Sequence, residues 1–178
     1  MSRTKLNVLV EGALMIALAT ILSYIKIFEM PQGGSITAVS MLPIILFATR
    51  WGVKQGLLTA MVYGVLQFLL QGGFSLSPWS ILLDYILAFG ALGLAGIFHG
   101  TRTKAVLGAL VGVFARFVVL VFSGVVLWYM YAPKGVSPLW YSITYNASYM
   151  VPELIITCVV LYLVYPCLLY TSPSPRDS

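Results

Sequence analysis

The sequence predicts an all-α membrane protein in which six transmembrane helices form a single bundle. Two observations lead to this prediction. Of the 178 residues, 60% are apolar and only 8% are charged, whereas soluble domains carry about 25% charged residues. The apolar residues also fall into runs of about 20, the length that a helix needs to cross a hydrocarbon layer of about 30 Å. Too few charged groups remain to cover the surface of a soluble protein.

The predicted helices are separated by the polar residues, glycines and prolines that interrupt the apolar runs. We expect six segments, over residues 6–28, 38–49, 55–70, 79–98, 105–131 and 145–169. The second is too short to cross the membrane in a straight path, so we expect it to be tilted or partly irregular and shielded from lipid. Residues 1–170 thus form one predicted domain. The proline-rich residues 171–178 (TSPSPRDS) are expected to be a disordered, non-native tail.

The distribution of basic residues predicts that both termini lie in the cytoplasm. In that orientation the inner flanks of the helices carry Arg3, Lys5, Arg50, Lys54, Arg102 and Lys104, and the outer loops carry only Lys26 and Lys134. An excess of Lys and Arg marks cytoplasmic loops. The net charge of +5 therefore reports membrane topology, and the basic residues form no patch of the kind that binds nucleic acid.

Ionisable residues inside the predicted spans are few: Glu11, Asp84, Arg116 and Glu153, with His99 at the inner end of the fourth segment. A charged group at this depth is costly and usually faces the interior of the bundle. Asp84, about one turn from the outer end of its helix, either receives a cationic or hydrogen-bonding ligand or pairs with Arg116. Glu153 follows Pro152 at an expected kink and is predicted to pair with Arg116. Glu11 is expected to snorkel or to meet a partner.

Aromatic side chains are concentrated at the same predicted outer end as Asp84. A helical stripe runs outward from Arg116 to Trp128, which either faces the ligand or belongs to the interfacial aromatic belt. The next loop and the sixth segment add Trp140, Tyr141, Tyr145, Asn146 and Tyr149. Aromatic faces around a carboxylate can cage a flat or cationic ligand, with about 0.5–2 kcal/mol from each cation–π contact. Asn146 either caps the sixth helix or directs its amide at the ligand.

The sequence contains no catalytic constellation and no metal-ligand spacing, so we expect neither an enzyme nor a resident cofactor or metal. Cys158 and Cys167 are expected to be small buried hydrophobes. A Walker-type phosphate loop is also missing, so uphill transport requires ATP hydrolysis by another polypeptide or an ion gradient. Ala13 and Ala17, one helical turn apart, either pack within the bundle or, if exposed, dock a partner helix.

Five segments of the sequence resemble the thiamine-specific S-components of energy-coupling-factor (ECF) transporters. They are MPQGGSITAVSMLPI (30–44), RWGVKQGL (50–57), ILLDYILAF (81–89), SGVVLW (123–128) and APKGVSPLWYSITYNASYMVP (132–152), and the similarity extends over residues 11–166. The resemblance implies a six-helix protein of the bacterial plasma membrane that binds thiamine with high affinity at its extracellular face. It also implies partners, namely a transmembrane coupling subunit and two ATPase subunits that drive import with ATP.

The resemblance also assigns roles to single residues. Asp84 stands at the position of an acidic thiamine ligand and is followed by Tyr85, and Trp128 stands where a side chain stacks on the ligand. Tyr141 and Asn146 match the polar pair that contacts the aminopyrimidine.

Two further elements of the family lie in the first third of the chain. Ala13 and Ala17 match an alanine motif that docks onto the coupling subunit. The first outer loop corresponds to a lid, with Gln32, Gly33, Gly34 and Ser35 as its residues.

One position departs from the family pattern Arg-Tyr-x-x-His-x-x-Ser-Gly. Leu120 stands at the histidine position, four residues before Gly124, and both are counted among the expected binding residues. Losing a stacking and hydrogen-bonding group is expected to weaken thiamine binding by about 1–3 kcal/mol, or to favour a related vitamer or precursor. The alternative function is a stand-alone, ion-coupled secondary transporter of a small cationic or heteroaromatic nutrient, using Asp84, Arg116 and Glu153.

Overall fold

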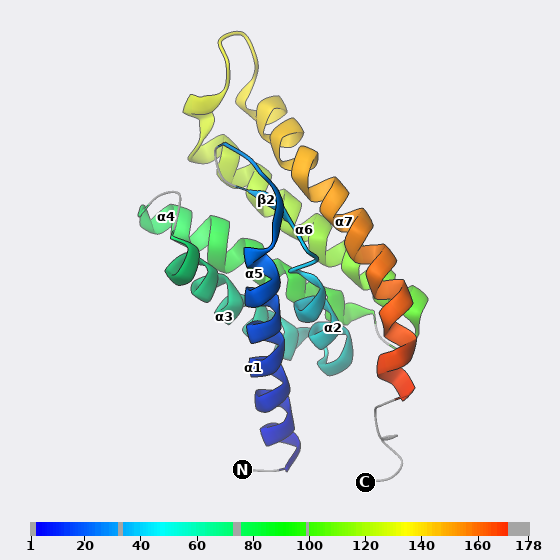
Figure 1. Cartoon of the computed structure of the whole chain (residues 1–178). Helices are drawn as coiled ribbons and strands as arrows, with labels where there is room; N and C mark the ends of the chain where they lie inside the picture. Colours follow the sequence, from blue (N-terminus) through cyan, green and yellow to red (C-terminus); the bar gives the residue numbers. More distant parts are fainter. Residues whose placement is uncertain (1–2, 32–33, 73–75, 99, 171–178) are drawn as a thin grey trace.

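The structure is a computed structural model that describes residues 3–31, 34–72, 76–98 and 100–170. Within these residues, five helical segments are long and apolar enough to cross a membrane. They are α1 (Arg3–Tyr24), α3 (Val53–Gln71), the composite segment Pro78–Ile97, α6 (Arg102–Val126) and α7 (Pro138–Tyr170). The shorter α2 (Leu42–Trp51) completes the set (Figure 1). The predicted all-α membrane fold is therefore confirmed.

Helix α2 is the short second segment that the sequence predicts. Pro43 lies in its first turn, where the missing N–H costs nothing, and Gly52, with a φ of 86°, separates it from α3. Ile44, Ile45 and Phe47 are almost fully buried against the neighbouring helices. The helix is thus shielded by the rest of the bundle, as expected from its length.

The fourth span changes its helical geometry along its length. It begins as α4 (Pro78–Ser80), widens into the π-helical η1 (Ile81–Leu87), returns to α5 (Ala88–Gly90) and ends in the 3₁₀-helical η2 (Ala91–Ile97). Small residues let it pack closely: a methyl group on Gly93 would lie 2.5 Å from the Leu57 Cα of α3. The hydrophobic effect does not drive helices together in lipid, so they associate through close backbone packing of this kind.

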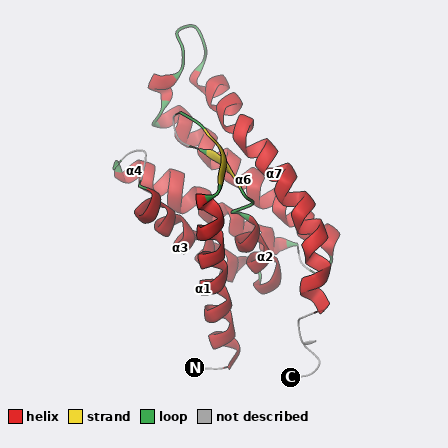
Figure 2. Ribbon diagram, in the orientation of Figure 1, coloured by secondary structure: helices red, strands yellow, loops and turns green. Residues whose placement is uncertain are grey.

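Helices α6 and α7 form the longest pair and lie side by side in Figures 1 and 2. The Thr101 hydroxyl caps α6 by accepting a hydrogen bond from the Lys104 N–H, at 3.3 Å. The helix ends at Val126, five residues before the predicted boundary, and is followed by the short η3 (Tyr129–Tyr131). Helix α7 begins at Pro138, seven residues earlier than predicted, because proline is well suited to a first helical turn.

A β-hairpin stands where the sequence predicts the end of the first helix (Figure 2). Strand β1 (Lys26–Glu29) pairs antiparallel with β2 (Ser35–Thr37), so the prediction of a helix through residue 28 is wrong. Alternating isoleucines at 25 and 27 favour a strand. A register shift between Lys26 and Phe28 marks a bulge, which places Lys26 and Glu29 on the same side of the hairpin.

The start of α1 and the end of α7 lie at the same end of the bundle (Figure 1). This agrees with termini on one side of the membrane, and their cytoplasmic location stays a prediction. The same is true of the division into one domain and a tail, because residues 171–178 lie outside the described residues, as does His99.

Candidate functional site

A cavity of about 470 Å³ lies among the hairpin, α3, the fourth span, α6 and α7. All the residues predicted to bind the ligand line it: Asp84, Tyr85, Leu120, Gly124, Trp128, Tyr141 and Asn146. Gly34 and Ser35 of the predicted lid also line it, whereas Gln32 and Gly33 lie outside the described residues. The structure thus brings together residues that are separated by more than one hundred positions in the sequence.

Asp84 lies in the π-helical turn η1 of the fourth span. Its Oδ2 accepts hydrogen bonds from the Trp128 indole Nε1 at 3.1 Å and from the Ser80 hydroxyl at 2.9 Å. Widened turns of this kind are frequent at functional sites, because they alter the direction of the side chains. The carboxylate is therefore held at the cavity wall by one donor from its own span and one from the turn that follows α6.

Arg116 makes neither of the ion pairs that the sequence suggests. Among the described residues, no ion pair joins it to Asp84 or to Glu153. Its guanidinium instead lies over the Phe89 ring, with Cζ 3.9 Å from the centroid, and its buried Nε has no hydrogen-bond partner in the described part of the chain. The expectation failed because depth in the membrane does not fix which helix faces a side chain.

Glu153 binds the hairpin rather than Arg116. Its Oε1 accepts a hydrogen bond of 2.5 Å from the Thr37 hydroxyl of β2, which also bonds with the Ser40 hydroxyl at 2.7 Å. All three residues are buried. By contrast Glu11 meets a partner as expected, with its Oε1 3.1 Å from Nη1 of Arg50.

Three tyrosines of α7 form an aromatic wall along one face of the helix. Tyr141, Tyr145 and Tyr149 recur every four residues, with ring centroids 5.9 and 6.2 Å apart. Two more aromatic residues that line the cavity, Trp128 and Tyr131, follow α6, and their ring centroids are 6.0 Å apart. Trp140 is 63% exposed and does not line the cavity, which agrees with a place in the interfacial belt.

Asn146 lies inside α7, so it is not the cap of that helix. Its Oδ1 accepts a hydrogen bond of 2.6 Å from the Tyr149 hydroxyl, and its Nδ2 donates to the Ser142 carbonyl at 2.9 Å. The Ser142 hydroxyl in turn donates to the Val121 carbonyl of α6 at 3.1 Å. A Cβ on Gly124 would collide with the Ser142 hydroxyl, so only glycine permits this contact between α6 and α7.

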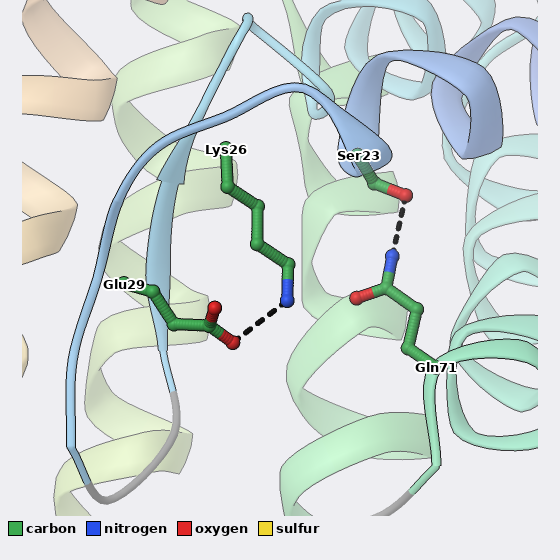
Figure 3. Close-up of polar contacts among 4 residues, drawn as sticks. All are labelled: Ser23, Lys26, Glu29 and Gln71. Atoms are coloured by element: carbon green, nitrogen blue, oxygen red, sulfur yellow. Dashed lines mark hydrogen bonds and ion pairs between the residues drawn. The ribbon is translucent and has the colours of Figure 1, made fainter.

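Sequence reasoning missed the side of the cavity formed by α1, α3 and β1. Gln67 and Gln71 donate to the Ser23 hydroxyl, at 3.0 and 2.7 Å. Figure 3 shows Gln71 pointing toward Ser23, and Lys26 toward Glu29, whose Oε1 lies 2.7 Å from the ammonium. The two glutamines, one turn apart in an apolar helix, are the signal that could have located this wall.

The loop after β1 approaches the aromatic wall through Gly34. This residue has a φ of 89°, and a Cβ there would lie 2.7 Å from Cε1 of Tyr149. The Met30 N–H donates to the Gly34 carbonyl at 2.9 Å, which closes the loop. Backbone rather than side chain therefore contacts Tyr149 at this point.

Ala13 and Ala17 lie on α1 and do not line the cavity. Both are exposed, together with Leu14 and Leu18 on the same helix. The small-residue pair therefore does not pack within the bundle.

The sequence pattern of the family described as thiamine transporter protein (Thia_YuaJ) matches residues 9–172. The chain belongs to this family. Thiamine transporter ThiT of Bacillus subtilis (strain 168) is 41% identical over 173 residues, which is 88% of this chain and 89% of that protein. Thiamine transporter ThiT of Lacticaseibacillus paracasei is 30% identical over 177 residues, or 88% of this chain and 86% of that protein.

Solved structures show the same fold. ThiT from Listeria monocytogenes matches with a TM-score of 0.81 at 24% identity, over 98% of both chains. The S component of a bacterial ECF transporter matches with a TM-score of 0.55 at 23% identity, over 93% of this chain and 94% of the other. With its five apolar spans, the chain is a multi-pass protein of the bacterial plasma membrane, and its relatives are transporters rather than enzymes.

Replacing Gly124 with alanine tests the close contact of α6 with α7. The added methyl group must displace the Ser142 hydroxyl, and overpacking of this kind costs about 1–3 kcal/mol. We expect the thermal unfolding temperature in detergent to fall by several degrees. The double variant Gly124→Ala/Ser142→Gly removes the obstructing side chain and should recover most of the loss. An unchanged unfolding temperature in Gly124→Ala would contradict the contact.

Proposed function

We propose that the chain is the thiamine-binding S-component of an ECF-type importer. It captures thiamine at the extracellular face and delivers it with a transmembrane coupling subunit and two ATPase subunits, which use ATP. The family and the names of the relatives support thiamine as the ligand. The similarity to an S component of a bacterial ECF transporter supports the type of assembly. The observation that carries the proposal is a carboxylate, Asp84, held beside an indole in a cavity walled by tyrosines.

The chemistry of thiamine fits this cavity. Its thiazolium ring carries a fixed positive charge, which a carboxylate and aromatic faces both attract. The hydrogen bonds from Trp128 and Ser80 both go to Oδ2 of Asp84, and a carboxylate has about four acceptor sites. The volume of about 470 Å³ is within the range of roughly 300–1,000 Å³ typical of small-molecule sites.

The amide of Asn146 suits the aminopyrimidine ring. Its Oδ1 accepts one hydrogen bond from Tyr149, and a carbonyl oxygen has a second lone pair with which to accept an amino N–H. The bond from Tyr149 fixes which atom of the amide is the acceptor. Tyr141, one turn away from Tyr145 on the same wall, completes the proposed ring-binding side.

Replacing Asp84 with asparagine keeps the shape of the side chain and removes its charge. We expect thiamine affinity to fall roughly 10- to 100-fold, because a contact with a charged group contributes about 1.5–3 kcal/mol. Trp128→Leu should weaken binding to a similar extent, whereas Trp140→Leu, at an exposed tryptophan outside the cavity, should not. Quenching of tryptophan fluorescence by thiamine measures all three. Equal affinities for the Trp128 and Trp140 variants would refute the assignment.

Replacing Leu120 with histidine restores the group that the family pattern has at this position. The residue lines the cavity, so the imidazole adds a stacking and hydrogen-bonding surface to the ligand site. We expect thiamine affinity to rise about tenfold or more, since about 1–3 kcal/mol is regained. Leu127→His, in the residue just after α6 and outside the cavity lining, is the matched control. A decrease in thiamine affinity would indicate that Leu120 is adapted to a different vitamer.

Leucine in place of Ala13 and Ala17 tests the proposed docking surface. Because these alanines are exposed and away from the cavity, thiamine binding to the isolated chain should be unchanged. Thiamine uptake by cells that contain the coupling subunit and ATPases should fall strongly, since bulky side chains prevent close helix contact. Val10→Leu, on the same helix, is the matched control, because it adds bulk without altering a small residue.

Uptake by the chain alone in proteoliposomes, driven by a pH gradient, would support the secondary transporter instead.

A further inference from the structure

A second hollow lies on the outside of the bundle, between α6 and α7. It has a volume of about 310 Å³ and is lined by Val106 of α6 and by Cys158, Val159, Tyr162 and Leu163 of α7. The α7 residues form two pairs one turn apart, 158 with 162 and 159 with 163, so they line one continuous face. Val159 and Leu163 are exposed. In a membrane-spanning bundle, a groove of this kind faces lipid.

A positively charged side chain, that of Arg102, lies at one end of this groove. Arg102 precedes Val106 by one turn on α6, and its guanidinium Cζ lies 4.9 Å from the centroid of the Tyr162 ring. The ring therefore holds the guanidinium beside the groove through a cation–π contact. Lys104, also exposed, lies in the same first turn of α6. Both cations lie in the first turn of α6, and this end of α6 lies beside the C-terminal part of α7 (Figure 1).

No carboxylate of the described residues neutralises these two cations. The described acidic side chains are engaged elsewhere: Glu11 with Arg50, Glu29 with Lys26, Asp84 with Trp128 and Glu153 with Thr37. An arginine that is fixed at the end of an apolar groove offers a planar set of donors to a phosphate. Basic pockets between transmembrane helices near the membrane surface recognise the headgroups of anionic lipids.

We propose that the groove between α6 and α7 is a binding site for one anionic phospholipid. An acyl chain lies along the face of Val106, Val159 and Leu163. The phosphate contacts Arg102, and Lys104 adds attraction for the net negative charge. Tyr162 positions the guanidinium. This site is separate from the thiamine cavity, with which it shares no lining residue, so it does not depend on the proposed function.

Native mass spectrometry of the full chain, released from detergent, tests this proposal. The probes are phosphatidylglycerol and phosphatidylcholine with identical acyl chains, supplied in equal amounts. We expect one retained lipid per chain with a preference of about fivefold or more for phosphatidylglycerol, because each basic residue contributes about that factor. Arg102→Gln should remove most of the preference. Lys54→Gln, an exposed charge loss away from the groove, should preserve it.

Variants of the residues that line the groove distinguish lipid binding in the groove from a general attraction of anionic headgroups to basic residues. Val159→Trp fills the hollow and should abolish retention of both lipids, whereas Val151→Trp, two turns away on the same exposed stripe, should not. Equal retention of the two lipids by the wild-type chain, or equal effects of Arg102→Gln and Lys54→Gln, would overturn the proposal. The proposal would also be overturned if Val159→Trp retained lipid as before but lost thiamine uptake. That result would assign the groove to a helix of a partner subunit.

Discussion

The hydrogen bond between Trp128 and Asp84 is the contact on which the cavity depends. A carboxylate inside an apolar bundle is costly, and it is tolerated only where donors or a polar cavity replace water. Here one donor, Trp128, comes from the turn between α6 and η3, and another, Ser80, from the same span as Asp84. The bond therefore joins the fourth span to the end of α6. It also fixes the position of the indole ring, so the charge and the aromatic surface are held side by side.

Two different kinds of contact attach the β-hairpin to the cavity. At β2, Thr37 donates to the buried carboxylate of Glu153, far along α7. At β1, the pair of Lys26 and Glu29 is partly exposed, and exposed ion pairs typically contribute only about 0.2–1 kcal/mol. Breaking the buried contact leaves a polar group unpaired, which is much more costly. The hairpin is therefore anchored mainly through β2, and its Lys26 side is held weakly.

The sequence contained enough to predict the spans, their order and many of the residues that line the cavity. Apolar runs report membrane depth, so the sequence alone predicts that Asp84 and Trp128 lie at one level in the membrane. The hairpin was missed because Ile25, Ile27 and Phe28 extend the apolar run with only Lys26 between them, and hydropathy does not distinguish a strand from a helix there. The pairing of Arg116 was also missed, since periodicity gives the face of a helix but not the neighbour that packs on it. Thr37, which donates a hydrogen bond to Glu153, lies more than one hundred residues away and has no local signature.

We propose that thiamine occupies the cavity between Asp84 and the tyrosines of α7. A crystal structure of the chain grown with saturating thiamine measures this most directly. We expect electron density for one thiamine in the cavity, with the carboxylate of Asp84 and the ring of Trp128 in contact with it and the amide of Asn146 at the aminopyrimidine. An empty cavity, or thiamine bound at another place on the protein, would contradict it.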